Sequence, residues 1–289
     1  MRIRPRTRGG FARNDPPVTG GGLAGVVLAA GNGTRLRPLT RLRPKALCPV
    51  GTVPLVDLAL ARVAPLAGAG ANDVAVNAHA FAALVADHLR DRAHVSVEVG
   101  EALGTAGALG LLREWIGGRN VVVTNADAYV PGGLGTLTGS WDGERSRLLC
   151  RPTPGAGDFP TVRPGLRYVG ACLLGWSSVR ALTATPSGLY EVLWRAQAER
   201  GELELVTLDE ATAGSVAIDC GTPADYLAAN LHASGGRSAL DPSAVVEGTV
   251  ERCVVWDGAY VGREEHLVQV IRAGTRAAPV TVPAAPRCE

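Results

Sequence analysis

The residues whose types and spacing are best suited to chemistry lie in one segment, Val26–Val50. An apolar run, Val26–Ala30, stops at Gly31-Asn32-Gly33-Thr34-Arg35. Two glycines let the backbone turn tightly and come close to a ligand, and such a loop offers several backbone N–H groups to an anion. Arg35 adds a planar fork that suits phosphate oxygens. The segment therefore predicts a phosphate-binding loop after a buried strand.

Lys45 follows this loop and is the only lysine in the chain, because every other basic residue is arginine. Pro38 and Pro44 stiffen the backbone that leads to it. Two common glycine motifs do not fit. A dinucleotide fingerprint needs a third glycine where Leu36 stands, and a Walker A loop needs Gly-Lys-Ser/Thr, whereas Lys45 follows Pro44.

Apolar strands alternate with amphipathic helices downstream of this segment. We expect helices at 54–67, 80–89 and 106–115, and strands at 74–77, 95–99 and 121–124. This alternation predicts an α/β fold with a largely parallel sheet covered on both faces. Ligands of such sheets bind beyond the carboxyl ends of the strands. The Gly31–Arg35 loop, Glu98–Gly107 and Asn125–Asp127 all fall at those ends.

Two aspartates follow separate strands. Asp127 ends a fully apolar strand, where a carboxylate has little reason to exist for stability, and a hard oxygen ligand suits Mg²⁺. Asp219 ends a short strand just before a predicted helix start at Thr222-Pro223, with Asp225 at capping-box-like spacing. Asp219 is not needed for that cap. Asp127 is therefore a candidate metal ligand, and the helix start leaves Asp219 without a structural role.

Taken together, these motifs resemble the nucleoside-diphosphate-sugar pyrophosphorylases, also called sugar-1-phosphate nucleotidyltransferases. The pattern from Gly31 to Lys45 matches their signature, and Asp219–Pro223 resembles their Asp-x-Gly-Thr-Pro motif. The Leu103–Gly107 stretch is most similar to that of mannose-1-phosphate guanylyltransferases. The resemblance implies a Rossmann-like nucleotidyltransferase domain with a mixed, mostly parallel sheet. It also implies transfer of a nucleotidyl group from an NTP to a sugar 1-phosphate, with Mg²⁺.

The resemblance also assigns roles to individual residues. It makes Lys45, Arg35 and Asp127 catalytic, and Asp127 and Asp219 the metal ligands. It implies nucleotide binding by Leu28, Ala30, Gly31, Gly33, Thr34, Arg35, Glu98, Gly104 and Thr105. It implies contacts with the sugar phosphate by Arg163, Gly170 and Glu191.

Several of these assignments leave alternatives open. Glu98 or Glu101 would accept hydrogen bonds from guanine, and Thr105 would cap the helix that follows it. The family's usual sugar-phosphate lysine is missing, so Arg163 is its expected substitute and Arg151 the rival. Ala126 replaces a glycine of the family's metal motif, and Ala217 replaces a tryptophan.

The composition limits the classes of protein further. A net charge of +2 argues against a dedicated nucleic-acid binder. No stretch approaches the ~20 apolar residues of a membrane span. The cysteines are scattered without a CxxC pair, which favours a reducing cytoplasm over zinc or disulfide frameworks; they are Cys48, Cys150, Cys172, Cys220, Cys253 and Cys288.

Four segments are predicted along the chain. An Arg/Gly/Pro-rich tail covers 1–22, the nucleotidyltransferase domain 23–236, a short β-helix-like segment 237–275 and a fraying tail 276–289. Regularly spaced valines and glycines after Arg237 carry the resemblance to a β-helix. Whether the chain forms a homo-oligomer stays open.

Three other readings of the motifs compete. One is a catalytically inactive homologue that only senses an NDP-sugar. Another is the same enzyme with uridylyl or thymidylyl specificity. The third is a glycosyltransferase on a related fold, but that class usually carries Asp-x-Asp, and Asn125-Ala126-Asp127 lacks the first aspartate.

Overall fold

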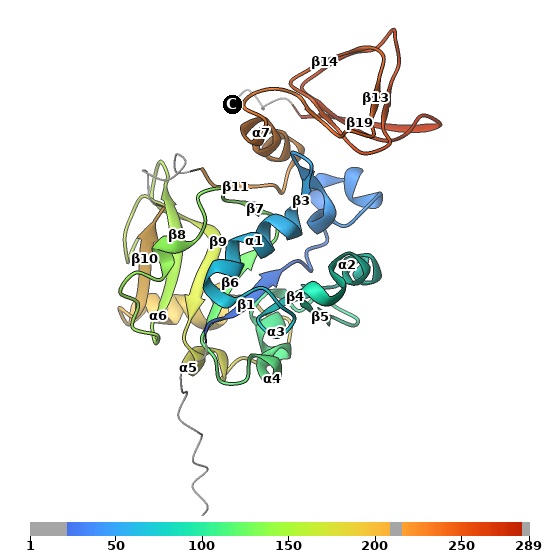
Figure 1. The fold of residues 1–289 in the computed structure, drawn as a ribbon. Helices are drawn as coiled ribbons and strands as arrows, with labels where there is room; N and C mark the ends of the chain where they lie inside the picture. The colour runs from blue at the N-terminus through green and yellow to red at the C-terminus, as the bar shows by residue number, and fades with distance from the viewer. Residues whose placement is uncertain (1–21, 209–215, 285–289) are drawn as a thin grey trace, which may run out of the picture.

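The computed structural model describes residues 22–208 and 216–284. Its centre is a seven-stranded sheet, which can be followed in Figure 1. Within this sheet β9 alone runs antiparallel to its neighbours, so the predicted mixed, mostly parallel sheet is confirmed. In spatial order the strands are β10 (Leu203–Thr207), β8 (Ser146–Pro152), β9 (Leu166–Leu174), β6 (Val121–Asn125), β1 (Ala24–Leu28), β4 (Val74–Ala78) and β5 (His94–Val97).

Helices cover both faces of the sheet, as the strand–helix alternation predicts. Aliphatic side chains of α1 (Leu55–Ala67) and α2 (Ala82–Leu89) pack on one face. The other face is covered by α3 (Gly104–Leu111), α4 (Arg113–Ile116), α5 (Trp176–Val179), a π-helical turn (Tyr190–Trp194) and α6 (Arg195–Glu199). Because both faces are buried, β1 and β6 are apolar along almost their whole length.

Some element boundaries differ from those expected. The helix expected at 106–115 is divided at Leu112 into α3 and α4, and it starts two residues earlier. The strand expected to reach Val99 ends at Val97, and the chain then turns at Gly100, which has φ 83°. Its carbonyl accepts a hydrogen bond from His79 Nε2 at 2.9 Å when that nitrogen is protonated. The turn directs the following residues toward the sheet edge where the candidate site lies.

A triangular coil follows α7 (Pro223–Ala233), as Figure 1 shows in red. Its three sides are stacked parallel strands, which confirms the predicted β-helix-like appendage. The strands are β12 (Ala239–Leu240), β13 (Val245–Val246), β14 (Thr249–Glu251), β15 (Val254–Val255), β16 (Tyr260–Val261), β17 (His266–Val268) and β18 (Val270–Thr275). The prediction of a fraying tail from 276 is wrong up to Pro283, because β19 (Ala278–Pro283) pairs antiparallel with β18 and closes the coil.

The coil is joined to the rest of the protein through a third apolar core, shared with α7 and the segment 36–55. Two short strands, β2 (Pro49–Val50) and β3 (Val53–Pro54), belong to that segment. Tyr226 of α7 is fully buried at its centre, donates a hydrogen bond to Pro49 O and accepts one from Trp256 Nε1 at 3.0 Å. The coil therefore contacts the chain just after Lys45.

We predict that Tyr226→Phe lowers the free energy of unfolding by about 1–3 kcal/mol, because Trp256 Nε1 would lose its acceptor while remaining buried. Urea unfolding would measure the change. Tyr190→Phe is the matched control, because Tyr190 is exposed. Equal stability of the two variants would show that the Tyr226 hydroxyl does not help to hold the coil.

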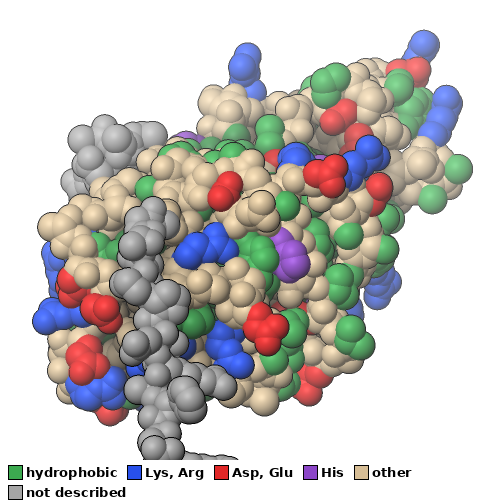
Figure 2. All heavy atoms as spheres, turned by 60° about the horizontal axis from the view of Figure 1, so that its bottom comes forward, with side chains coloured by type: hydrophobic (Ala, Val, Ile, Leu, Met, Phe, Trp, Pro, Cys, Tyr) green, Lys and Arg blue, Asp and Glu red, His purple; other side chains and the backbone are tan. Residues whose placement is uncertain are grey.

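Charged side chains on the face drawn in Figure 2 are interspersed in sign rather than gathered into one patch. The formal net charge of the whole chain is +2. Within the described ranges, no helix combines the length and apolarity needed to cross a bilayer.

Candidate active site

Three parallel strands end side by side at one edge of the sheet. Leu28, at the end of β1, lies in register with Asn77 of β4 and Asn125 of β6. Asn77 Oδ1 accepts a hydrogen bond from Ala29 N at 2.6 Å, which holds the chain where it leaves β1. No role was predicted for the Asn77 side chain, although a polar residue at the end of an apolar strand is a signal that sequence offers.

The loop after β1 is held in a compact turn. Gly33 has φ 57°, and Thr40 Oγ1 donates a hydrogen bond to its carbonyl at 2.8 Å. A Cβ at Gly33 would come within 2.8 Å of Thr40 Cγ2, so this position has both a conformational and a steric need for glycine. Arg35 extends from the next short turn and is 66% exposed. The loop thus presents its backbone and one arginine to solvent at the sheet edge.

Lys45 is buried and lies between the two aspartates that were predicted to bind metal. Its Nζ is 2.5 Å from Asp127 Oδ2 and 3.6 Å from Asp219 Oδ1. Arg35 Nη2 lies 3.4 Å from the other oxygen of Asp219. Side chains from three separate parts of the sequence therefore form one cluster of two cations and two carboxylates.

A two-residue ladder brings the aspartates together. Asp219 lies in β11 (Ile218–Asp219), which pairs antiparallel with β7 (Ala128–Tyr129), and Asp219 is opposite Ala128. Cys220 N donates a hydrogen bond to Asp127 O at 2.9 Å. Next to β11, Thr222 caps α7 by accepting from Asp225 N at 3.2 Å, which confirms the predicted helix start.

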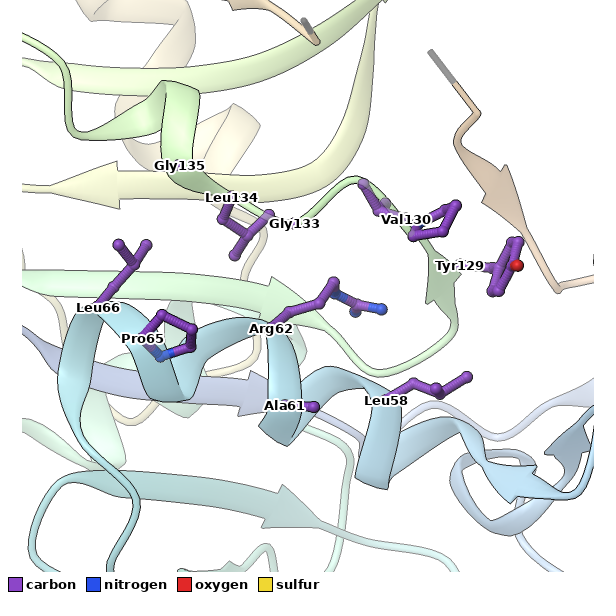
Figure 3. A pocket seen from close by; sticks show the side chains of 11 residues that line it. Leu58, Ala61, Arg62, Pro65, Leu66, Tyr129, Val130, Gly133, Leu134 and Gly135 are labelled. Atoms are coloured by element: carbon purple, nitrogen blue, oxygen red, sulfur yellow. The ribbon is translucent and has the colours of Figure 1, made fainter. Parts of the chain in front are cut away.

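Arg62 braces the end of β6, next to this cluster, and no role was predicted for it from the sequence. It lies on α1 and donates from Nη2 to Thr124 Oγ1 at 3.1 Å and to Asn125 O at 3.0 Å. Figure 3 shows it among apolar side chains in a cavity of about 360 Å³. Burial lowers the pKa of Arg62 to about 10. An arginine in the middle of an amphipathic helix gives no sequence signal of such a contact.

Two further cavities, separate from the one around Arg62, lie at the sheet edge. The first cavity, of about 260 Å³, opens over the ends of β1, β4 and β6, where a nucleotide was predicted to bind. Six of the predicted site residues line it, from the glycine loop, the start of α3 and the end of β6. Its lining is Leu28, Ala30, Gly31, Asn32, Asn77, Ala102, Gly104, Thr105, Asn125 and Asp127.

Glu98 was expected to face a guanine base, but the structure places it under the cavity wall. Its side chain is buried, Oε1 accepts from Asn77 Nδ2 at 2.7 Å and Oε2 accepts from Leu103 N at 2.8 Å. Both oxygens thus serve the protein's own donors. Glu98 and Asn77 together tie the loop before α3 to the end of β1. Glu98 therefore supports the cavity wall rather than facing a base. Glu101, the alternative, is exposed.

Thr105 does not cap α3 as expected, because the helix begins one residue before it. Its Oγ1 instead accepts from Leu189 N at 2.8 Å. The glycines beside it serve the same packing. A Cβ on Gly104 would come within 2.6 Å of Ser187 O, and one on Gly107 would come still closer to Thr185 O. The start of α3 therefore packs closely against the segment 185–187. Gly104 and Thr105 also line the first cavity.

We predict that Glu98→Gln destabilises the protein by about 1–3 kcal/mol, because one glutamine oxygen cannot accept from both donors and its amide would face one of them. Urea unfolding and hydrogen exchange at the Leu103 amide would measure the effect.

Glu101→Gln is the control for this substitution, since an exposed position should change stability by less than about 0.5 kcal/mol. If the two variants unfold alike and exchange at Leu103 is unchanged, Glu98 does not brace the loop.

A second cavity, of about 650 Å³, adjoins the first. Asn125 and Asp127 line both cavities, so the two meet at the end of β6. Gly170 of β9, for which a contact with the sugar phosphate was predicted, lines the second cavity and has φ 80°. The remaining lining is Arg35, Ala128, Arg151, Asp158, Arg167, Tyr168, Val169, Ala217, Ile218, Asp219, Asp225 and Ala228.

Two predicted sugar-phosphate residues lie outside both of these cavities. Arg163 follows a turn in which its N–H bonds to Phe159 O at 3.0 Å, and it lines a separate hollow beside the end of β10. Glu191 is exposed on the π-helical turn. The rival residue Arg151 does line the second cavity, together with Arg167, which sequence reasoning did not single out.

The carboxylates fit a magnesium ion that is completed by substrate. Among the described residues, no three His, Cys, Asp or Glu side chains are grouped so that they could hold a metal by themselves. Mg²⁺ is usually bound by one or two carboxylates plus substrate phosphates and water. Asp127 and Asp219 both contact the single ammonium of Lys45, so a cation between them could reach both.

A ligand site beyond the carboxyl ends of parallel strands defines the class of α/β folds that bind their ligands at this edge of the sheet. Within that class, residues 24–141 match the family model described as nucleotidyl transferase. The match covers less than half of the chain, so residues 24–141 are similar to nucleotidyl transferases.

Two curated relatives are named as a uridylyltransferase and a nucleotidyltransferase. The chain is 38% identical over 132 residues to an N-acetylmuramate alpha-1-phosphate uridylyltransferase of Caulobacter vibrioides, a match covering 42% of this chain and 53% of that one. It is 31% identical over 126 residues to the low-salt glycan biosynthesis nucleotidyltransferase Agl11 of Haloferax volcanii, covering 42% and 34%. The chain thus spans about half or less of these relatives' lengths.

The fold has a near match in a solved structure. The mannose-1-phosphate geranyltransferase of Thermus thermophilus superposes with a TM-score of 0.64 at 17% identity, covering 91% of this chain and 95% of that one. At this identity the comparison concerns the fold alone, including the C-terminal part.

Proposed function

We propose that the protein is a sugar-1-phosphate nucleotidyltransferase, which makes an NDP-sugar and pyrophosphate from an NTP and a sugar 1-phosphate. The observation that carries this proposal is the pair of cavities that meet at Asn125 and Asp127, with Lys45, Arg35 and Asp219 beside the junction. A two-substrate transfer needs such a meeting point. The names of the relatives support the same reaction class.

In this mechanism an oxygen of the sugar phosphate attacks the α-phosphorus of the NTP in line, and pyrophosphate leaves. The protein aligns two anions and neutralises the charge that develops between them. At ~4 Å and an effective dielectric constant of ~20, each contact between like charges costs roughly 4 kcal/mol. Lys45, Arg35 and the backbone of the Gly31–Arg35 loop are suited to offset that repulsion. Mg²⁺ on Asp127 and Asp219 would supply further positive charge.

The base and the sugar are separate questions. The expectation of GTP with mannose 1-phosphate rested partly on Glu98, which supports the cavity wall instead. Glu101 is still available to accept hydrogen bonds from guanine, whereas the Caulobacter relative is named as a uridylyltransferase. The comparison of GTP with UTP is therefore the decisive one for the base.

The experiment is pyrophosphate release from GTP, UTP, dTTP, ATP and CTP, each combined with several sugar 1-phosphates. We expect release that depends on both substrates and on Mg²⁺, and Asp219→Asn should raise the Mg²⁺ concentration needed. If no combination turns over while NDP-sugars bind, the protein is an inactive sensor. If it instead transfers sugar from an NDP-sugar, it is a glycosyltransferase.

We further predict opposite effects of Lys45→Met on catalysis and on metal binding. Loss of an electrostatic donor should lower kcat on the order of 10²–10³-fold. In the absence of nucleotide, however, the two carboxylates lose a competing cation, so Mn²⁺ should bind roughly tenfold more tightly, a change of ~1.4 kcal/mol. Electron paramagnetic resonance of free Mn²⁺ would measure this affinity.

Lys45→Arg separates the two effects. It keeps the positive charge, so Mn²⁺ affinity should stay near that of the wild type, whereas its wider planar fork should still lower kcat. Weaker Mn²⁺ binding in Lys45→Met would show that Lys45 does not compete with the metal. Near-normal kcat in both variants would show that Lys45 has no catalytic role.

A further inference from the structure

Two arginines face each other inside the second cavity. Arg151 of β8 and Arg167 of β9 are directly opposite in the antiparallel ladder, and both line the cavity. Like charges directly opposite each other in a ladder are destabilising. The pair therefore has a cost for the fold that a bound anion would remove.

The described residues provide little compensation for this pair. Their one ion pair with either arginine joins Arg167 Nε to Asp158 Oδ1 at 3.8 Å, and the two side chains are 55% and 40% exposed. The other oxygen of Asp158 accepts a hydrogen bond from Tyr168 N at 2.9 Å. Asp158 is thus held in place by the backbone and balances at most one of the two guanidinium groups.

The pair also lies away from the point where the phosphates would react. The transferred group belongs at the junction of the two cavities, beside Asn125 and Asp127, where Gly170 packs against Asn125. Arg167 precedes Gly170 by three residues, which is roughly 10 Å along a strand. Lys45, Arg35 and the metal carboxylates already surround the junction, whereas the arginine pair faces the part of the cavity left for the sugar.

Resting on the proposed function, we infer that the sugar 1-phosphate used by this protein carries a second anionic group, a carboxylate, which Arg151 and Arg167 bind. Arginine binds carboxylates through two parallel hydrogen bonds, and two facing arginines provide this geometry from both strands. The substrate class is an acidic sugar 1-phosphate.

Matched pairs of sugar 1-phosphates test this inference. Glucuronate 1-phosphate differs from glucose 1-phosphate by a carboxylate in place of CH₂OH, and N-acetylmuramate 1-phosphate differs from N-acetylglucosamine 1-phosphate by an acidic ether substituent. We expect wild-type protein to show a kcat/KM higher by on the order of 10- to 100-fold for the acidic member of at least one pair, as for a hydrogen-bonded charged group.

Arg167→Gln should remove most of this preference while leaving the neutral member within about threefold of wild type, because the transition-state contacts at the junction stay intact. Arg151→Gln should lower kcat/KM for the acidic member more than for the neutral one. Arg180→Gln is the control, since Arg180 is exposed beyond α5, after the opposite end of β9. Thermal shifts with the same sugar 1-phosphates would report binding preference independently of turnover.

The outcomes separate the two proposals. Equal kcat/KM and equal thermal shifts for neutral and acidic members would overturn the inference and leave the nucleotidyl transfer intact. A similar loss on both members in the arginine variants would also overturn it, because the pair would then contact the 1-phosphate itself. Absence of pyrophosphate release with every substrate would overturn the proposed function, and the thermal shifts would still decide whether a carboxylate is recognised.

Discussion

The mutual neutralisation of Lys45, Arg35, Asp127 and Asp219 is the interaction on which the candidate site depends. Two anionic substrates need a strongly positive junction, but an unpaired buried ammonium would be costly in their absence. The carboxylates remove this cost by holding the Lys45 Nζ at 2.5 Å and 3.6 Å. The same carboxylates are suited to a divalent cation. One set of side chains can therefore neutralise Lys45 without substrate and hold a cation beside the phosphates when substrate is bound.

The sequence predicted the parts of the site that depend on local chain geometry. A glycine loop after an apolar strand and a carboxylate at a strand end can be recognised from neighbours alone, and the structure places Asp127 beside Asp219. Roles that depend on distant partners could not be predicted. Glu98 is engaged by Asn77, and Arg62 reaches Asn125 from a helix surface, and neither distance is encoded in local spacing.

The arginines of the second cavity illustrate the same limit. Arg163 was chosen because it stands in the nearest match to a family segment, yet a turn at Phe159 directs it elsewhere. Arg151 and Arg167 become neighbours only through the register of β8 with β9, which includes an irregularity between Leu148 and Cys150. Such a bulge shifts every later pairing and leaves no clear mark in the sequence.

The short pairing of β7 with β11 has a consequence for how the protein matures. Arg35 and Asp219 are 184 residues apart in sequence, and contacts of such long range carry the loop-closure entropy that slows folding. A chain that is still emerging from the ribosome can form the glycine loop and β6 without Asp219. The two aspartates come together only after β11 has been synthesised and has paired with β7.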